Sequence, residues 1–121
     1  MRATAAIAKA AFVSVGAADT AALKKLVKQA GEAAQHLKLL ANEKRLLILC
    51  FLAARGEMTV GELVDAVELS QSALSQHLAK LRADRLVTFR RTAQTLHYSV
   101  ADKRTLLLLQ ALKEIYCDKL K

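Results

Sequence analysis

Residues 69–82 combine small, hydrogen-bonding side chains with regularly spaced leucines. If this run is helical, at about 100° per residue, its side chains divide between two faces. One face holds Leu74, Leu78 and Leu81. The opposite face has neither bulky nor acidic residues and carries Gln71, Ser72, Ser75, Gln76 and Ala79. Such a face can enter the major groove of DNA, where Gln can pair with adenine and Ser can bond to base edges or phosphates.

Basic residues extend this candidate DNA surface. Residues 69–100 carry five Lys or Arg and one Asp, whereas residues 56–68 carry four acids and no base. Lys80 and Arg82 flank the polar face and can reach phosphates, and Arg90 and Arg91 suit backbone or minor-groove contact. His77 falls between the two faces, where we expect it to be half-buried or to contact phosphate. The predicted DNA-binding residues are Ser70, Gln71, Ser72, Ser75, Gln76, His77, Lys80, Arg90, Arg91, Thr92 and Gln94.

The alternative interpretation is an ordinary amphipathic surface helix followed by two solubilising arginines. The exposed face of such a helix is normally rich in Glu and Lys. Here the outward face holds no charge until Lys80, and a basic hairpin follows at once. This combination favours DNA recognition.

The composition predicts one mainly helical domain. The chain has 121 residues, no proline and a net charge of +8, and it contains 23 Ala and 22 Leu. Ala and Leu are strong helix formers, so the composition excludes a β-sandwich and a disulfide-rich scaffold. No run of apolar residues approaches the 18 that a membrane span needs, so we expect no membrane partner.

The hydrophobic pattern and the helix caps predict the order α-α-α-α-β-β-α, a winged helix-turn-helix. The expected helices cover residues 19–41, 43–55, 60–67, 71–84 and 102–119. Two strands of alternating residues begin near Leu86 and end at Val100, with a hairpin tip at 92–94. Residues 1–18 read as a weakly ordered arm, too short and poorly flanked for a signal peptide. Residues 19–121 form the DNA-binding and dimerisation domain.

Three stretches resemble the ArsR/SmtB family of bacterial winged-helix repressors. They are residues 37–49, residues 70–82 with their Ser-Gln-Ser-Ala-Leu-Ser-Gln-His-Leu run, and Tyr98-Ser99. The resemblance implies a homodimer joined through its first and last helices, an inverted-repeat operator, and release by an inducer. The last helix is apolar over more than half its circumference, which supports a dimer independently. The sequence departs from the family at Arg85 and at the hairpin tip, where glycine is usual.

The metal sites of that family are missing. Its Cys-x-Cys motif would fall at residues 59–65, which contain no cysteine, and Asp102 is followed by a Leu-rich helix without histidine. We therefore expect no metal and no cofactor.

The two cysteines are the remaining sensing candidates. Cys50 lies in a helix that is apolar all round, and Cys117 lies near the end of the last helix. This placement resembles the sulfide- and redox-responsive BigR and SqrR branch, whose paired thiols are joined by a disulfide or polysulfide bridge. The resemblance implies that joining Cys50 to Cys117 releases DNA. A buried structural Cys50, an unseen inducer and an unorthodox metal site remain open.

Other classes of protein are less compatible with the sequence. There is no Gly-rich phosphate loop, no paired carboxylates in an apolar setting and no nucleophile beside a base, so we expect no enzyme. A general architectural DNA-binding protein is the second alternative, and it would bind all sequences with similar affinity. Two cysteines 67 positions apart fit a cytoplasmic protein better than a stapled secreted one.

Overall fold

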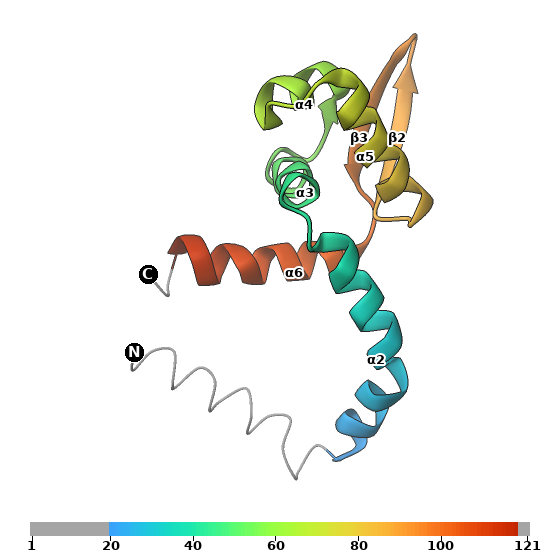
Figure 1. The fold of residues 1–121 in the computed structure, drawn as a ribbon, viewed down its shortest axis with the longest axis vertical. Helices are drawn as coiled ribbons and strands as arrows, with labels where there is room; N and C mark the ends of the chain where they lie inside the picture. The colour runs from blue at the N-terminus through green and yellow to red at the C-terminus, as the bar shows by residue number, and fades with distance from the viewer. Residues whose placement is uncertain (1–19, 119–121) are drawn as a thin grey trace.

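The computed structural model describes residues 20–118, so the predicted arm at 1–18 and the predicted cap Asp19 lie outside the described residues. Figure 1 shows a winged helix-turn-helix, as predicted, with a long helix extending from its base. The elements are α2 (Thr20–Leu40), α3 (Glu43–Arg55), β1 (Met58–Thr59), α4 (Val60–Val67), α5 (Gln71–Ala83), β2 (Val87–Thr92), β3 (Thr95–Val100), α6 (Lys103–Lys113) and the π-helical segment η2 (Glu114–Asp118).

Four helices begin at the side-chain caps that the sequence predicts. The Asn42 side chain accepts a hydrogen bond from the Arg45 amide at the start of α3. Thr59 and Glu62 form a reciprocal capping box at α4, and Ser70 and Asp102 cap α5 and α6. Each cap satisfies amides that the first turn of a helix leaves without partners, which fixes where the helix begins.

Helix α3 lies at the centre of the domain, between α4 and α6 and beside α5 and the hairpin (Figure 1). Its residues Ile48, Leu49 and Leu52 are fully buried. Leu47 and Cys50 are exposed, so this helix, although apolar all round, is not enclosed on every side within the single chain. One face of α3 is open to solvent or to a partner.

The sheet has three antiparallel strands in the order β1-β3-β2, and β1 was not predicted. It contributes only two residues, too few to show alternation, and it pairs Met58 with Tyr98 and Thr59 with His97. Because Thr92 pairs with Thr95, the hairpin tip is Ala93 and Gln94, one residue shorter than predicted.

Helices α2 and α6 meet at the base of the domain through two polar contacts. The buried Thr105 hydroxyl lies 2.8 Å from His36 Nε2, and Arg104 Nη1 donates to Glu32 Oε1 at 2.8 Å. Beyond Lys113 the chain continues as η2 instead of the α-helix predicted to run to residue 119. No helix within residues 20–118 has the length and apolar character to cross a bilayer.

Two residues adopt left-handed backbone conformations at the positions where the sequence lacks the family's usual glycines. Arg85 has φ 63° and Ala93 has φ 54°. At the end of α5, the amides of Arg85 and Leu86 donate to the carbonyls of Arg82 and Leu81, a Schellman arrangement in which the residue after the cap is left-handed. The turn is formed in spite of the side chain at position 85.

We predict that Arg85→Gly stabilises the fold. A left-handed conformation costs an L-residue about 1–2 kcal/mol, partly offset by the greater chain entropy of glycine. The net gain in the free energy of unfolding should be about 1 kcal/mol, measured by urea denaturation. Arg85→Ala is the control, because it removes the side chain without relieving the backbone. Equal stability of the two variants would contradict this explanation.

Candidate nucleic-acid interface

Helix α5 buries one face and exposes the other, as its sequence predicts. Leu74, Leu78 and Leu81 are at most 1% exposed and pack into the core. The exposed polar side chains form what we call the Ser/Gln ridge: Gln71, Ser72, Ser75 and Gln76. No other element of the described chain covers this ridge, so it is available to an external partner.

The first turn of α5 carries no acidic residue. The Ser70 hydroxyl accepts a hydrogen bond from the Ala73 amide at 3.1 Å and lies 3.3 Å from the Ser72 hydroxyl. The positive end of the helix dipole is therefore not compensated by a first-turn carboxylate, an arrangement that favours anions such as phosphate. Ser70 combines a capping role with a position at the edge of the ridge.

His77 is half-buried, as predicted, and contacts a side chain of another helix. Arg45 Nε on α3 donates to His77 Nδ1 at 3.3 Å. Partial burial, and to a smaller extent the Arg45 charge, hold the pKa of His77 below its usual value. Because Nδ1 accepts this bond, the neutral ring carries its proton on Nε2, which makes Nε2 a donor. The sequence reasoning did not identify Arg45 as its partner.

The basic residues at the end of α5 have different surroundings. Lys80 lies on the surface, with its Nζ 3.5 Å from Asp84 Oδ2 in an i,i+4 pair. The Arg82 guanidinium instead lies over the Phe89 ring, 4.2 Å from its centroid. Arg82 therefore packs the helix against the hairpin, in addition to the phosphate reach that its position predicts.

The β2–β3 hairpin, which we call the wing, places the predicted arginines on opposite faces of the sheet. Arg90 forms three hydrogen bonds with the Glu57 carboxylate, at 2.8–3.1 Å. Thr92 Oγ1 lies 2.8 Å from His97 Nε2. Arg91 is exposed, and within residues 20–118 it has no salt bridge or side-chain hydrogen bond. The sequence reasoning did not identify Glu57.

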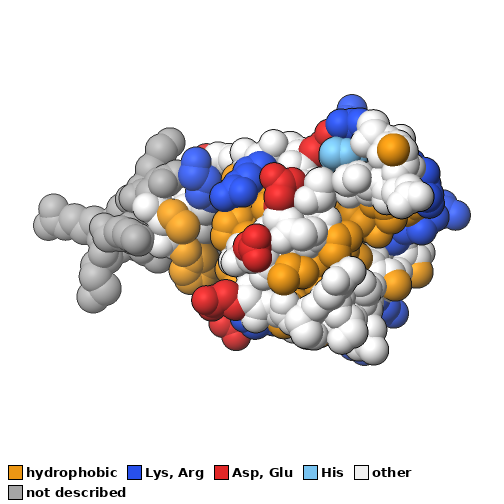
Figure 2. Space-filling view, turned by 90° about the horizontal axis from the view of Figure 1, so that it is seen from above, with side chains coloured by type: hydrophobic (Ala, Val, Ile, Leu, Met, Phe, Trp, Pro, Cys, Tyr) orange, Lys and Arg blue, Asp and Glu red, His pale blue; other side chains and the backbone are white. Residues whose placement is uncertain are grey.

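Basic side chains concentrate on one edge of the domain. Viewed from above in Figure 2, many Lys and Arg side chains lie along the right edge, whereas most Asp and Glu side chains lie further left, where other Lys and Arg side chains stand beside them. The exposed acids of the negative segment are Glu57, Glu62, Asp65 and Glu68. A polyanion would be drawn toward α5 and the wing and repelled from α4.

The two cysteines are free thiols, both exposed in the single chain. Burial by its neighbours raises the pKa of Cys50, and so does the charge of Cys117. Residues 20–118 contain no group of three metal-ligating side chains.

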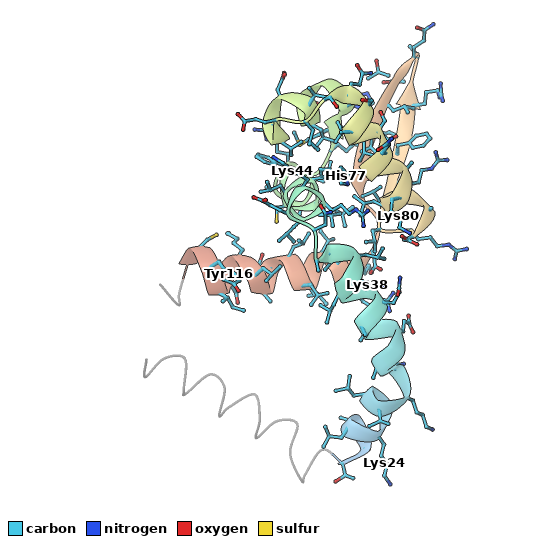
Figure 3. The ribbon with its side chains drawn as sticks, in the orientation of Figure 1. Lys24, Lys38, Lys44, His77, Lys80 and Tyr116 are labelled. Atoms are coloured by element: carbon cyan, nitrogen blue, oxygen red, sulfur yellow. The ribbon has the colours of Figure 1, made fainter. Side chains whose placement is uncertain are left out.

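An apolar surface lies on the helices that flank the domain. Figure 3 shows Lys24 near the N-terminal end of α2 and Tyr116 at the end of the C-terminal helix, away from His77 and Lys80 on α5. Large apolar side chains are exposed on these elements, which is unusual for a monomer. They are Leu23, Leu26, Val27 and Leu37 on α2, Leu106 and Leu107 on α6, and Ile115 and Tyr116 on η2.

Known proteins resemble this chain over most of its length. The family model described as bacterial regulatory protein, arsR family, matches residues 42–88. The transcriptional activator HlyU of Vibrio cholerae is 46% identical over 96 residues, 79% of this chain and 88% of HlyU. The nodulation protein NolR of Rhizobium meliloti is 56% identical over 86 residues, 71% of this chain and 70% of NolR. The crystal structure of the transcriptional repressor BigR from Xylella fastidiosa matches with a TM-score of 0.73 at 34% identity, over 79% of this chain and 97% of BigR.

The lowered pKa of His77 predicts a pH-dependent stability. As the pH falls below about 6.5, the ordinary pKa of histidine, the unfolded chain takes up this proton before the folded chain does. The free energy of unfolding should therefore fall between about pH 6.5 and the lower pKa of the folded state, and His77→Gln should remove this part of the decline. Urea denaturation at stepped pH measures the effect. A folded-state pKa of His77 at or above 6.5, read by NMR titration, would contradict the prediction.

Proposed function

This chain belongs to the arsR family of bacterial regulatory proteins, which bind DNA, and we propose that it is a homodimeric repressor. In this proposal it acts in the cytoplasm, binds an inverted-repeat operator, and is released when Cys50 and Cys117 become joined. The single observation that carries the proposal is the exposed, uncharged Ser/Gln ridge on α5. A ridge of amide and hydroxyl groups can read base edges, whereas an acidic helix face would be repelled by the phosphate backbones.

In this proposal the ridge and the wing make different kinds of contact with DNA. Gln71 and Gln76 read bases in the major groove, and the serines bond to base edges or phosphates. Lys80 and the Nε2 of His77 contact the phosphate backbone, and the wing contacts DNA beside the helix through Arg91, Thr92 and Gln94. Arg90, which the sequence also predicted as a contact, is paired with Glu57. Phosphate contacts set position and affinity, and base contacts set specificity.

The apolar surface on α2, α6 and η2 supports the proposed dimer. A second copy of the chain would cover side chains such as Leu107, which is 71% exposed, and Val27, which is 76% exposed. A two-fold axis through this surface would present two α5 helices to successive major grooves, about 34 Å apart. The operator would then be an inverted repeat, because its symmetry mirrors that of the protein.

The proposed signal is a polysulfide, which supplies the oxidising power. Because the raised pKa of Cys50 disfavours its thiolate, Cys117 attacks first. The Cys117 thiolate attacks an internal sulfur, an S–S bond of the polysulfide breaks, and the shorter fragment leaves with the electron pair. The Cys50 thiolate then attacks the sulfur chain on Cys117 and displaces hydrosulfide. The two thiols lose two electrons and two protons, and the polysulfide is reduced.

Joining the cysteines would couple the core to the dimer surface. Cys50 lies on α3, which carries the core leucines, and Cys117 lies on η2 at the end of the dimer helix. A covalent bridge between them would change how α5 is spaced from its two-fold mate, and a bias of a few kcal/mol is enough to switch a two-state regulator.

We predict that Gln71→Ala and Gln76→Ala relax base preference. The discrimination against a mismatched base should fall by about 1–3 kcal/mol at the position each residue reads. Competition binding between the DNA upstream of the protein's own gene and single-base variants of its footprinted site measures this. Gln35→Ala, an exposed position on α2, is the control. A uniform loss of affinity on every duplex would contradict base reading and favour an architectural role.

We further predict that a polysulfide donor joins Cys50 to Cys117 within one chain and releases the same DNA. Mass spectrometry identifies the bridge, and a gel shift follows release. Cys50→Ser and Cys117→Ser should each remain bound. Parallel treatment with peroxide and with zinc distinguishes other inducers. Release of DNA by the donor with both thiols unmodified would reject the thiol mechanism while leaving DNA binding intact.

A further inference from the structure

We propose that Glu57 is a positioning residue that holds Arg90 away from DNA and leaves Arg91 as the arginine through which the wing contacts phosphate. This inference rests on the proposed function and refines it at one site. It assigns a role to the outer face of the sheet, where a carboxylate lies beside an arginine that would otherwise be a DNA contact.

The Glu57–Arg90 pair uses most of the guanidinium. Arg90 Nε donates to Glu57 Oε2 at 2.8 Å and to Oε1 at 3.1 Å, and Arg90 Nη2 donates to Oε1 at 2.9 Å. The hydrogen bonds from Arg90 lower the pKa of Glu57, and the Glu57 carboxylate raises the pKa of Arg90, so both groups stay charged. A phosphate approaching Arg90 would have to displace this carboxylate or accept the repulsion of its charge.

The sheet register places the two arginines on opposite faces. Arg90 is opposite His97, which in turn pairs with Thr59, so these three residues form a row on one face. Glu57 is two residues before Thr59, and it reaches across β3 to Arg90 on this outer face.

The other face of the wing is the one that α5 contacts. Along β2, Phe89 and Arg91 lie on the face opposite to that of Arg90. The Arg82 guanidinium of α5 stacks on the Phe89 ring. Arg91 therefore extends from the same face as the contact with α5 and lies beyond Phe89 toward the tip. Its exposure and its position beside the ridge helix make it the wing arginine best placed for a phosphate.

The position of Glu57 in the chain makes it a suitable anchor. It follows Gly56, which ends α3 with φ 84°, and it precedes Met58, which is buried in the core. The carboxylate is thus attached to the rigid centre of the domain, and its bonds to Arg90 link the wing to that centre. This exposed pair adds little to stability, because water and salt screen it, so its main effect is on which groups can meet DNA.

The test measures the salt dependence of binding to a mixed-sequence duplex by fluorescence anisotropy, between about 50 and 200 mM salt. Glu57→Gln keeps the size of the side chain and removes its charge, which releases Arg90. The slope of log K against log salt should become steeper by up to about 0.9 per protomer, the value for one added phosphate contact. Arg91→Ala should make the slope shallower by a similar amount, and Arg90→Ala should leave it unchanged.

Two controls separate release of Arg90 from a general change in charge. Glu62→Gln removes an equivalent exposed negative charge, and glutamine retains the capping box at α4, so this variant should keep the wild-type slope. The double variant Glu57→Gln with Arg90→Ala should also return to the wild-type slope. Thermal unfolding checks that each variant is folded, and Arg90→Gln replaces Arg90→Ala if the latter is not.

Three results would overturn this inference. They are an Arg90→Ala slope as shallow as that of Arg91→Ala, a Glu57→Gln slope equal to that of the wild type or of Glu62→Gln, and a Glu57→Gln effect that persists without Arg90. In each case the wild type still binds DNA, so the proposed function stands. A wild-type protein that binds no duplex at the lowest salt would overturn both.

Discussion

The burial of three leucines on α5 is the constraint on which the rest of the structure depends. Folding buries the side chains of Leu74, Leu78 and Leu81. Burial of each leucine stabilises the folded state by about 1.5–3 kcal/mol. Because a helix turns by about 100° per residue, this commitment fixes the rotation of α5 about its axis. The Ser/Gln ridge is outward because the leucines are inward. The polar side chains of the ridge remain hydrated, so their exposure carries no free-energy cost.

Three arginine contacts then link α5, α3 and the wing to one another. Arg45 joins α3 to α5 through His77, Arg82 joins α5 to the wing through Phe89, and Arg90 joins the wing to the end of α3 through Glu57. Arginine suits these contacts because its planar group stacks on rings and pairs with carboxylates in two-point geometry. The net positive charge of the domain thus includes arginines that organise the surface as well as residues available to meet DNA.

Much of the fold could be predicted because its determinants are local. The caps Asn42, Thr59, Ser70 and Asp102 lie next to the amides they satisfy, and the alternation in the hairpin is visible within a few residues. Arg85, which stands where the family usually has glycine, adopts a positive φ, because the turn after α5 keeps its left-handed conformation. The features that were missed depend on residues distant in sequence.

The features that the sequence did not predict depend on contacts between residues far apart in the chain. Strand β1 is defined by its partner β3, and the Glu57–Arg90 contact spans 33 positions, so neither has a periodic signal. The exposure of Cys50 has no local sequence signal either, because an apolar helix can be open on one face within a single chain. The π-helical end of the last helix gives no distinct sequence pattern either.

The central claim is that DNA meets the chain at the Ser/Gln ridge, with the wing beside it. The most direct measurement is an NMR titration of isotopically labelled protein with the DNA upstream of its own gene. The account predicts that the amide signals that change most belong to residues 70–77 and 90–95, and that those of the acidic helix α4 stay largely unchanged. Changes concentrated on α4, with residues 70–77 unaffected, would contradict it.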